Sequence, residues 1–453
     1  MHRFGRFLSS RISLLWFLTE VTVVITSTAV NADDYDALLS KATAQEQVSV
    51  IVTGWQPITG TSTFSGSADS YQAVTGESEL VLDSIRAKRG QVTEVRQFKY
   101  IPALVMSADL AALQAAKTFS ANVDVFEDKY NRLFLSESPQ QVRAERLWAR
   151  GLTGKGQWVA VLDSGIDTSH PFFKGKKILE ACFSPKCPNG KTSMIGKGAA
   201  KPVNPHGTHV AGIALGRGKN FTGVAPDANL IAVNVFDEEG RANDGSILAA
   251  FDYLVGLKVE KKLAIASINL SLGHGKFSRP CGNSVFEFAR KITDRFNMVV
   301  VAASGNEHAK NAIASPSFTP GIVSVGAVSK RGEVAKFSNS ADFLSLLAPG
   351  VGIVSSVPPS LAKGKAFVPL SGTSMAAPHV AGAFALLRQA DRDTSVAELV
   401  TLLTNSGRLV SDPENEVKKP LIQLDKIEVG VSKSKNFSIS KTTNENGMTS
   451  ITE

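Results

Sequence analysis

Two patterns of hydrophobic and polar positions divide the chain into two folded units. In the first unit, apolar runs at Val48–Val52 and Ile101–Met106 predict strands. Helical spacing of apolar residues predicts helices at Glu79–Lys88 and Ser107–Thr118. Strands and helices that alternate over about 100 residues are typical of a small α/β domain. We therefore assign residues 33–138 to such a domain.

The second unit, residues 139–429, has strands that are continuously apolar. These runs are Trp158–Leu162, Leu230–Val235, Ile265–Leu270, Met298–Ala303 and Ile322–Val328. Helical patterns lie between several of them, at Gly207–Leu215, Ser246–Val259 and Ser284–Arg295. Strands that are apolar on both faces indicate a parallel sheet covered by helices on both sides. The polar residues 430–453 predict a disordered tail.

Composition narrows the class of protein. Hydrophobic residues make up 43% and charged residues 20% of the 453 residues, which excludes global disorder and a multi-pass membrane protein. The net charge of +8 is modest, and its clearest cluster, within Lys174–Lys201, carries no nucleic-acid-binding motif. We therefore expect a solvated basic surface and no nucleic-acid partner.

Residues 1–32 have the pattern of an export signal. Three arginines precede an apolar run from Ile12 to Val30, and small residues up to Ala32 offer a cleavage site. An uncleaved membrane anchor is the alternative, but Glu20 and several threonines interrupt the run. We expect a cleaved signal peptide, no stable membrane span, and a secreted or periplasmic product.

Export permits disulfide bonds. Cys182 and Cys187 lie in a loop that contains Pro and Gly, where they could close a small ring and leave Cys281 free. Pairing of Cys281 with either of the other two stays open. The spacing of Cys and His residues does not resemble a zinc site.

Three segments place reactive side chains at the ends of the expected elements. V-A-V-L-D-S-G-I-D ends a strand at Asp163, H-G-T-H-V-A-G opens a helix at His206, and S-G-T-S-M-A-A-P-H-V-A-G places Ser374 at a helix N-terminus. The carboxyl ends of parallel strands bind ligands, and helix N-termini favour developing negative charge. Singly, such an Asp is more often a turn residue and such a Ser an N-cap. His206 and His209 lack the spacing of a zinc-protease helix.

Together, in the order Asp, His, Ser, these segments resemble the subtilisin family of serine proteases over about residues 140–428. The resemblance implies the family's three-layer fold and a serine endopeptidase that forms an acyl-enzyme and needs no cofactor. Ser374 would be the nucleophile, His206 the general base and Asp163 the group that orients the imidazole. His209 and His379 would be structural.

The same resemblance assigns the remaining site residues. V-V-V-A-A-S-G-N-E ends at Asn306 and Glu307, and the Asn306 amide would bind the oxyanion with the Ser374 N–H, supported by Thr373. Substrate-binding segments would be Gly240, Arg241 and Ala242, then Ser271, Leu272 and Gly273, then Ala303, Ser304 and Gly305. The acidic run Asp237-Glu238-Glu239 either favours basic substrate residues or forms a plain surface turn.

By size and element order, residues 33–138 are similar to the ferredoxin-like inhibitor propeptide of these proteases. The resemblance implies a self-processing zymogen, cut within Leu133–Gln141 and inhibited by its own propeptide, that acts as a monomer on protein or peptide substrates. Two alternatives remain. The chain could be a degenerate protease fold kept as a binding module, or the same enzyme could act chiefly by transpeptidation or esterolysis.

The chain departs from the family pattern at its expected calcium site and at one inserted loop. His170-Pro171 is followed by Phe172 where a calcium-binding Asp is common, and the stretch from Gly212 to Gly223 is short. We therefore expect the main calcium site to be absent, while other calcium sites stay open. An insertion at Lys174–Val203 predicts a surface loop beside the active site.

Overall fold

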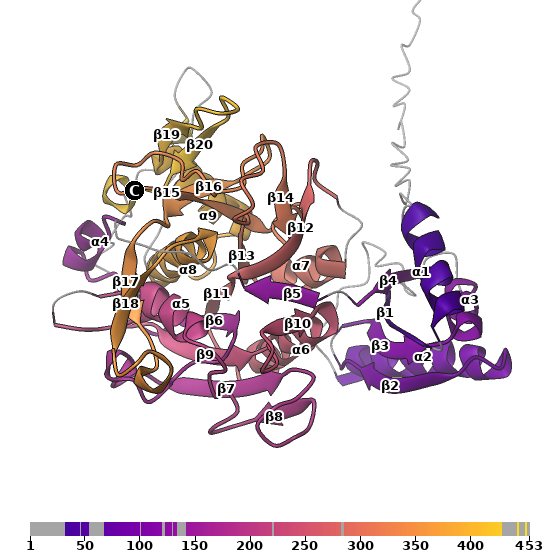
Figure 1. Ribbon diagram of the computed structural model, residues 1–453. Coiled ribbons are helices and arrows are strands. Elements are labelled where there is room, and N and C mark those ends of the chain that lie inside the picture. Colours follow the sequence, from indigo (N-terminus) through magenta and orange to yellow (C-terminus); the bar gives the residue numbers. More distant parts are fainter. Residues whose placement is uncertain are drawn as a thin grey trace, which may run out of the picture.

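The structure is a computed structural model. It describes residues 32–45, 47–53, 68–99, 101–119, 123–128, 130–133, 142–219, 222–281, 285–427, 442–443 and 449–450. The predicted export signal and most of the predicted tail lie outside these ranges, and within the tail β21 (Thr442–Thr443) pairs with β22 (Thr449–Ser450). Over the described ranges, no helix has both the length and the apolar character needed to cross a membrane. Figure 1 shows a small unit seated against a larger one.

The small unit is an antiparallel sheet with helices on one face. Its strands are β1 (Val48–Thr53), β2 (Val92–Gln97), β3 (Ala103–Ala108) and β4 (Asp124–Glu127), and its helices are α1 (Ala32–Ala44), α2 (Ala68–Ala87) and α3 (Leu110–Lys117). The sheet order β2-β3-β1-β4, with the chain order β-α-β-β-α-β from β1 to β4, is the ferredoxin-like topology. Strand β2 escapes detection from sequence because it is largely solvent-accessible and lacks an apolar run.

The two faces of this sheet have different partners. Val50 and Met106 pack against the helices of the small unit. Their neighbours Ile51 and Val105 point to the other face and belong to a hydrophobic core of the large unit. The small unit is therefore attached through a buried apolar face.

The large unit is built on a mixed sheet of ten strands among the described residues. Its order is β19-β20-β16-β15-β13-β11-β6-β9-β7-β8. The strands are β6 (Trp158–Asp163), β7 (Ile178–Phe183), β8 (Ser193–Ile195), β9 (Asn229–Asn234), β11 (Ile265–Leu270), β13 (Val299–Ala303), β15 (Val323–Val328), β16 (Leu346–Pro349), β19 (Arg408–Ser411) and β20 (Lys418–Leu421). Neighbours are parallel except at the two edges, where β7–β8 and β19–β20 are antiparallel. The predicted parallel sheet is confirmed.

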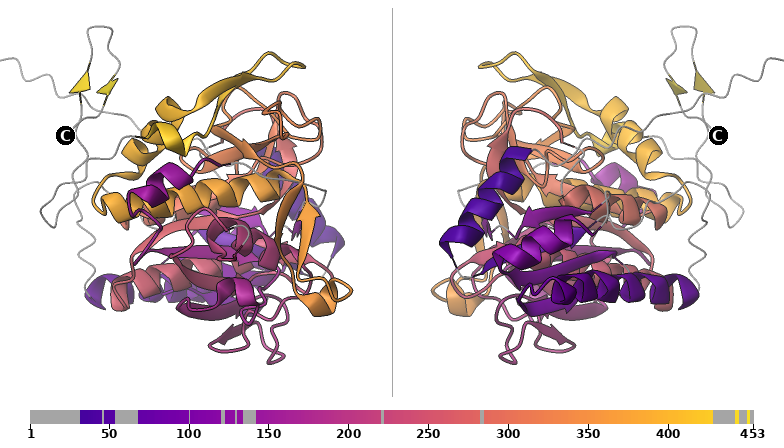
Figure 2. Two further views of the ribbon diagram at one scale, coloured as in Figure 1. Left: turned by 90° about the vertical axis from the view of Figure 1, so that its left-hand side faces the viewer. Right: turned by 90° about the vertical axis from the view of Figure 1, so that its right-hand side faces the viewer.

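Helices cover both faces of this sheet (Figure 2). One face carries α4 (Glu145–Ala149), α5 (His206–Leu215), α8 (Thr373–Ala390) and α9 (Val396–Ser406), and the other carries α6 (Asp244–Glu260) and α7 (Val285–Arg295). Along β6, Val159 and Val161 enter the first core, whereas Ala160 and Leu162 enter the second. Burial on both sides explains why these strands are continuously apolar.

The prediction that Lys174–Val203 is only a surface loop is wrong. Strand β7 pairs in parallel with β9, and β8 returns beside β7, so the insertion extends the central sheet. Glu180 interrupts the apolar run and hides the strand in the sequence, but its carboxylate accepts hydrogen bonds from Thr168 and Gly198. Of the disulfide pairings left open by the sequence, Cys182–Cys187 is the one present, and Cys281 is exposed and free.

Candidate active site

The candidate catalytic residues meet at one edge of the central sheet. Asp163 is the last residue of β6, His206 the first of α5, and Ser374 the second of α8. Each of the three is at most 1% exposed. Asn306 follows shortly after the end of β13. The carboxyl ends of parallel strands share an edge, so this convergence follows from the predicted topology.

Asp163 and His206 form a buried hydrogen-bonded pair. His206 Nδ1 lies 2.8 Å from Asp163 Oδ1, which also accepts a hydrogen bond from the Ser164 backbone at 2.7 Å. A carboxylate at Nδ1 favours the tautomer with its proton on Nδ1. His206 Nε2 is buried and has no hydrogen-bond partner among the described residues. The imidazole is therefore oriented to accept a proton at Nε2.

Two residues that the sequence analysis did not identify support this pair. Asn204 Oδ1 accepts a hydrogen bond from the His206 backbone N–H at 2.9 Å. The Ser164 hydroxyl accepts one from the Gly207 N–H at 3.1 Å. These side chains satisfy donors in the first turn of α5, which lack partners within the helix. An Asn two residues before a helix is the signal that would have revealed the first of them.

Ser374 is held by Ser271 in the resting chain. The Ser374 hydroxyl donates to the Ser271 carbonyl at 3.1 Å, and the Ser271 hydroxyl donates to the Ser374 carbonyl at 2.8 Å. The hydrogen bond that a triad needs between Ser374 Oγ and His206 Nε2 is not formed. Such bonds are often long in resting enzymes and tighten when the substrate binds.

The Asn306 side chain has a fixed orientation. Its Oδ1 accepts hydrogen bonds from the Thr373 N–H at 2.9 Å and the Thr373 hydroxyl at 3.0 Å. Its Nδ2 is buried and has no partner among the described residues. The Ser374 N–H, in the first turn of α8, has no acceptor within the helix. These donors fit the two positions that an oxyanion requires.

A groove beside these residues already holds a strand of the small unit. Strand β5 (Tyr130–Leu133) lies between β10 (Arg241–Asn243) and β12 (Leu272–Phe277), and β14 (Ile313–Ser315) completes this second sheet (Figure 1). Both pairings of β5 are antiparallel. Of the predicted substrate-binding segments, Arg241 and Ala242 thus pair with one edge of β5 and Leu272 and Gly273 with the other.

The acidic run before this groove does not form a set of free carboxylates. Asp237 is 3% exposed and pairs with Arg241 at 3.0 Å, and Glu239 lies 3.1 Å from the same guanidinium. The run is therefore a turn braced by Arg241. Of the two alternatives, these contacts favour the plain turn for Asp237 and Glu239, while Glu238 is exposed.

His209 and His379 lie close to the site but are buried and neutral. Burial lowers the pKa of His209 to about 3 and that of His379 to about 4. His209 bonds to the Val368 carbonyl at 3.0 Å, on β18 (Phe367–Leu370), which pairs with β17 (Ile353–Ser356). His379 bonds to the Met375 carbonyl at 2.8 Å. Within the described part of the chain, no three His, Cys, Asp or Glu side chains are grouped to hold a metal.

Comparison with known proteins places this geometry in a family. The model of the subtilase family matches residues 154–433. Subtilisin E of Bacillus subtilis is 34% identical over 313 residues, which cover 67% of this chain and 74% of that protein. The major intracellular serine protease of Bacillus subtilis is 35% identical over 267 residues, 57% of this chain and 77% of that protein. Subtilisin BL of Lederbergia lenta is 35% identical over 269 residues, 59% and 89% of the two chains.

The chain belongs to the subtilase family. It is a serine endopeptidase of the Asp-His-Ser type, and its chemistry needs no cofactor.

Proposed function

We propose that Asp163, His206 and Ser374 are the catalytic triad of this endopeptidase. The observation that carries the assignment is the buried His206–Asp163 hydrogen bond of 2.8 Å, which leaves His206 Nε2 without a partner. Ser374 Oγ attacks the substrate carbonyl while His206 Nε2 takes its proton. His206 then gives that proton to the leaving amine, which departs as the acyl-enzyme forms. Water hydrolyses the acyl-enzyme by the same two proton transfers, and Asp163 stabilises the imidazolium throughout.

The oxyanion of each tetrahedral intermediate would lie between Asn306 Nδ2 and the Ser374 N–H. Thr373 contributes indirectly. Its two hydrogen bonds hold Asn306 Oδ1, so that Nδ2 points away from Thr373. Donors that are fixed before the reaction need no reorganisation when negative charge develops. This supports Asn306 as a catalytic residue and Thr373 as its support.

The substrate would bind as an extended strand in the groove that β5 fills. Strands β10 and β12 flank β5 on both sides, so a peptide there gains backbone hydrogen bonds along two edges. Ala303 ends β13, Ser304 and Gly305 follow it, and the three would form the wall opposite Ser271–Gly273. Gly305 has a φ of +105°, a conformation that favours glycine.

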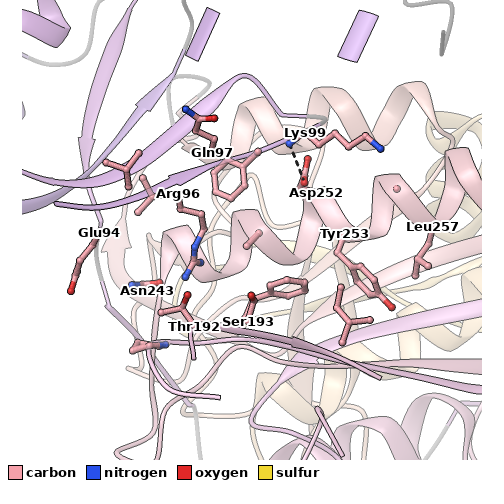
Figure 3. Close-up of a pocket in the computed structure, with 18 of the residues that line it drawn as sticks. Glu94, Arg96, Gln97, Lys99, Thr192, Ser193, Asn243, Asp252, Tyr253 and Leu257 are labelled. Atoms are coloured by element: carbon pink, nitrogen blue, oxygen red, sulfur yellow. Dashed lines mark hydrogen bonds between the residues drawn. The ribbon is translucent and has the colours of Figure 1, made fainter. Parts of the chain in front are cut away.

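The small unit would act as an inhibitor propeptide. It contacts α6 at both ends of that helix: Asp128 accepts a hydrogen bond from the Gly245 N–H at 2.9 Å, and Lys99 pairs with Glu260 at 2.6 Å. A pocket of about 1400 Å³ lies between the two units. Arg96 and Lys99 of the small unit and Asp252 and Tyr253 of α6 line it (Figure 3), and the Lys99 backbone N–H donates to the Asp252 carboxylate at 3.3 Å. An interface with this much unfilled space suits a unit that must later dissociate.

The register of β5 supports a cleavage position. Leu133 pairs with Leu272 and Arg132 with Gly273. Leu272 directly follows Ser271, whose carbonyl accepts the Ser374 hydroxyl, so β5 ends close to the candidate nucleophile. We therefore place the self-processing cut at the C-terminal end of β5 or shortly after it, within the range Leu133–Gln141.

Export and the absence of the main calcium site complete the proposal. The Cys182–Cys187 disulfide supports an oxidising destination, as the export signal at residues 1–32 predicts. Phe172 is 2% exposed where the family pattern has Asp, and a Cβ on Gly216 would lie 2.0 Å from its ring. This aromatic packing supports the absence of the main calcium site. We propose a secreted or periplasmic monomer.

Hydrolysis of an unstructured peptide tests the triad. The purified chain should cleave it, the Ser374→Ala variant should not, and Ser360→Ala, an exposed serine, serves as the matched control. Mass analysis of the products separates hydrolysis from transpeptidation. A folded but inactive parent chain would favour the binding-module alternative.

A further inference from the structure

We propose that Asn339 is a positioning residue that holds the Asn306 loop in its oxyanion-binding geometry. The proposal rests on the proposed function, because Asn339 would act through Asn306. Asn339 itself is completely buried. It lies in the connection between β15 and β16, outside both strands.

The Asn339 side chain forms hydrogen bonds with the loop residues that follow Asn306. Its Oδ1 accepts hydrogen bonds from the backbone N–H groups of Glu307 at 3.1 Å and Ala309 at 2.9 Å. Its Nδ2 donates to Glu307 Oε2 at 2.6 Å. The oxygen and the nitrogen of the Asn339 carboxamide thus both form hydrogen bonds with this loop, at Glu307 and Ala309.

The Asn339 backbone forms hydrogen bonds with the loop residues that precede Asn306. Its N–H donates to the Gly305 carbonyl at 3.0 Å, and its carbonyl accepts the Ser304 hydroxyl at 3.0 Å. The two sets of bonds enclose Asn306, whose own amide contacts Thr373 and not Asn339. Asn339 therefore fixes the backbone that carries Asn306 without touching the reacting atoms.

Part of this loop has a strained backbone and needs support from outside the loop. His308 has a φ of +56°, which non-glycine residues rarely adopt. Without Asn339, the Glu307 and Ala309 donors would lose their partners. A catalytic group displaced by about 1 Å can cost roughly 100-fold in rate.

A kinetic cycle tests the proposal. Asn339→Ala should lower kcat by about 10- to 100-fold with little change in KM. In an Asn306→Ala background the same change should lower kcat by less than about twofold, because the group it positions is gone. Active-site titration with a serine-reactive fluorophosphonate normalises each rate to folded enzyme. Ser340→Ala, the neighbouring side chain outside the Asn339–loop hydrogen bonds, is the matched control and should keep full activity.

A charge exchange between positions 339 and 307 is a second test, and it keeps a side chain of similar size at both positions. Asn339→Asp sets two carboxylates against each other and should lower kcat, whereas adding Glu307→Gln restores a donor facing the Asp and should recover most of the rate. Equal losses from Asn339→Ala in both backgrounds, or no recovery in the exchange, would overturn the proposal. If Asn306→Ala alone loses no activity, the proposed function of Asn306 fails instead.

Discussion

The Asp128 carboxylate of the small unit accepts a hydrogen bond from the Gly245 N–H, 2.9 Å away in the first turn of α6. Its other oxygen lies 3.3 Å from the Ser49 hydroxyl, and Arg96 is a nearby positive charge. Burial nevertheless dominates and raises the pKa of Asp128 to about 6. One buried carboxyl therefore links the attachment of the small unit to pH.

We predict that the small unit is held more tightly in acid than at neutral pH. The raised pKa means that docking takes up a proton, so the added stability is complete below about pH 4 and is lost as pH rises through about 6. A shift of two pKa units corresponds to roughly 100-fold in the docking equilibrium. Hydrogen exchange in full-length Ser374→Ala should show faster opening of the Gly245 amide at pH 7.5 than at pH 5, after correction for intrinsic rates. Asp128→Asn should remove this dependence, and an unchanged pH profile would contradict the assignment.

We predict that buried histidines limit stability in acid. His209 and His379 have lowered pKa values in the fold, so the unfolded chain binds more protons below about pH 6.5. Stability is then complete above that pH and falls by about 1 kcal/mol per pH unit for each group on acidification. Urea unfolding of Ser374→Ala between pH 7 and pH 4 measures this slope. His379→Gln should flatten it, and an equal slope in both proteins would disprove the role of His379.

We predict that Asn306→Ala lowers kcat by about 100- to 1000-fold while KM changes little, because the lost donor acts on the transition state. Thr373→Val should cost less, because it removes one of the two hydrogen bonds that orient Asn306 Oδ1. Steady-state kinetics on one peptide substrate compares the three proteins. A change confined to KM would show that Asn306 binds the ground state instead.

We predict that the region around Phe172 is stabilised by aromatic packing and not by calcium. Phe172 contacts Phe367 edge-on, with ring centroids 5.3 Å apart. Phe172→Ala should lower the free energy of unfolding by about 3 kcal/mol. The same loss should be measured with and without a chelator, because calcium does not contribute at Phe172. A loss that disappears when the chelator is added would contradict this prediction.

The sequence predicted the residues whose position depends on local structure. Asp163 ends an apolar strand, and His206 and Ser374 begin helical patterns, so topology brings them to one edge. Contacts between distant segments were not predictable. Asn339 bonds to a loop some thirty residues earlier, and β5 inserts between two strands of the other unit. No local pattern encodes either pairing.

The most direct test of the account is mass spectrometry of the purified chain and its Ser374→Ala variant after incubation at neutral pH. The account predicts that only the parent chain is cut, that the cut falls within Leu133–Gln141, and that the processed chain then hydrolyses an added peptide. Cleavage of both proteins at the same bond would contradict it, because another nucleophile or another protease would then be responsible.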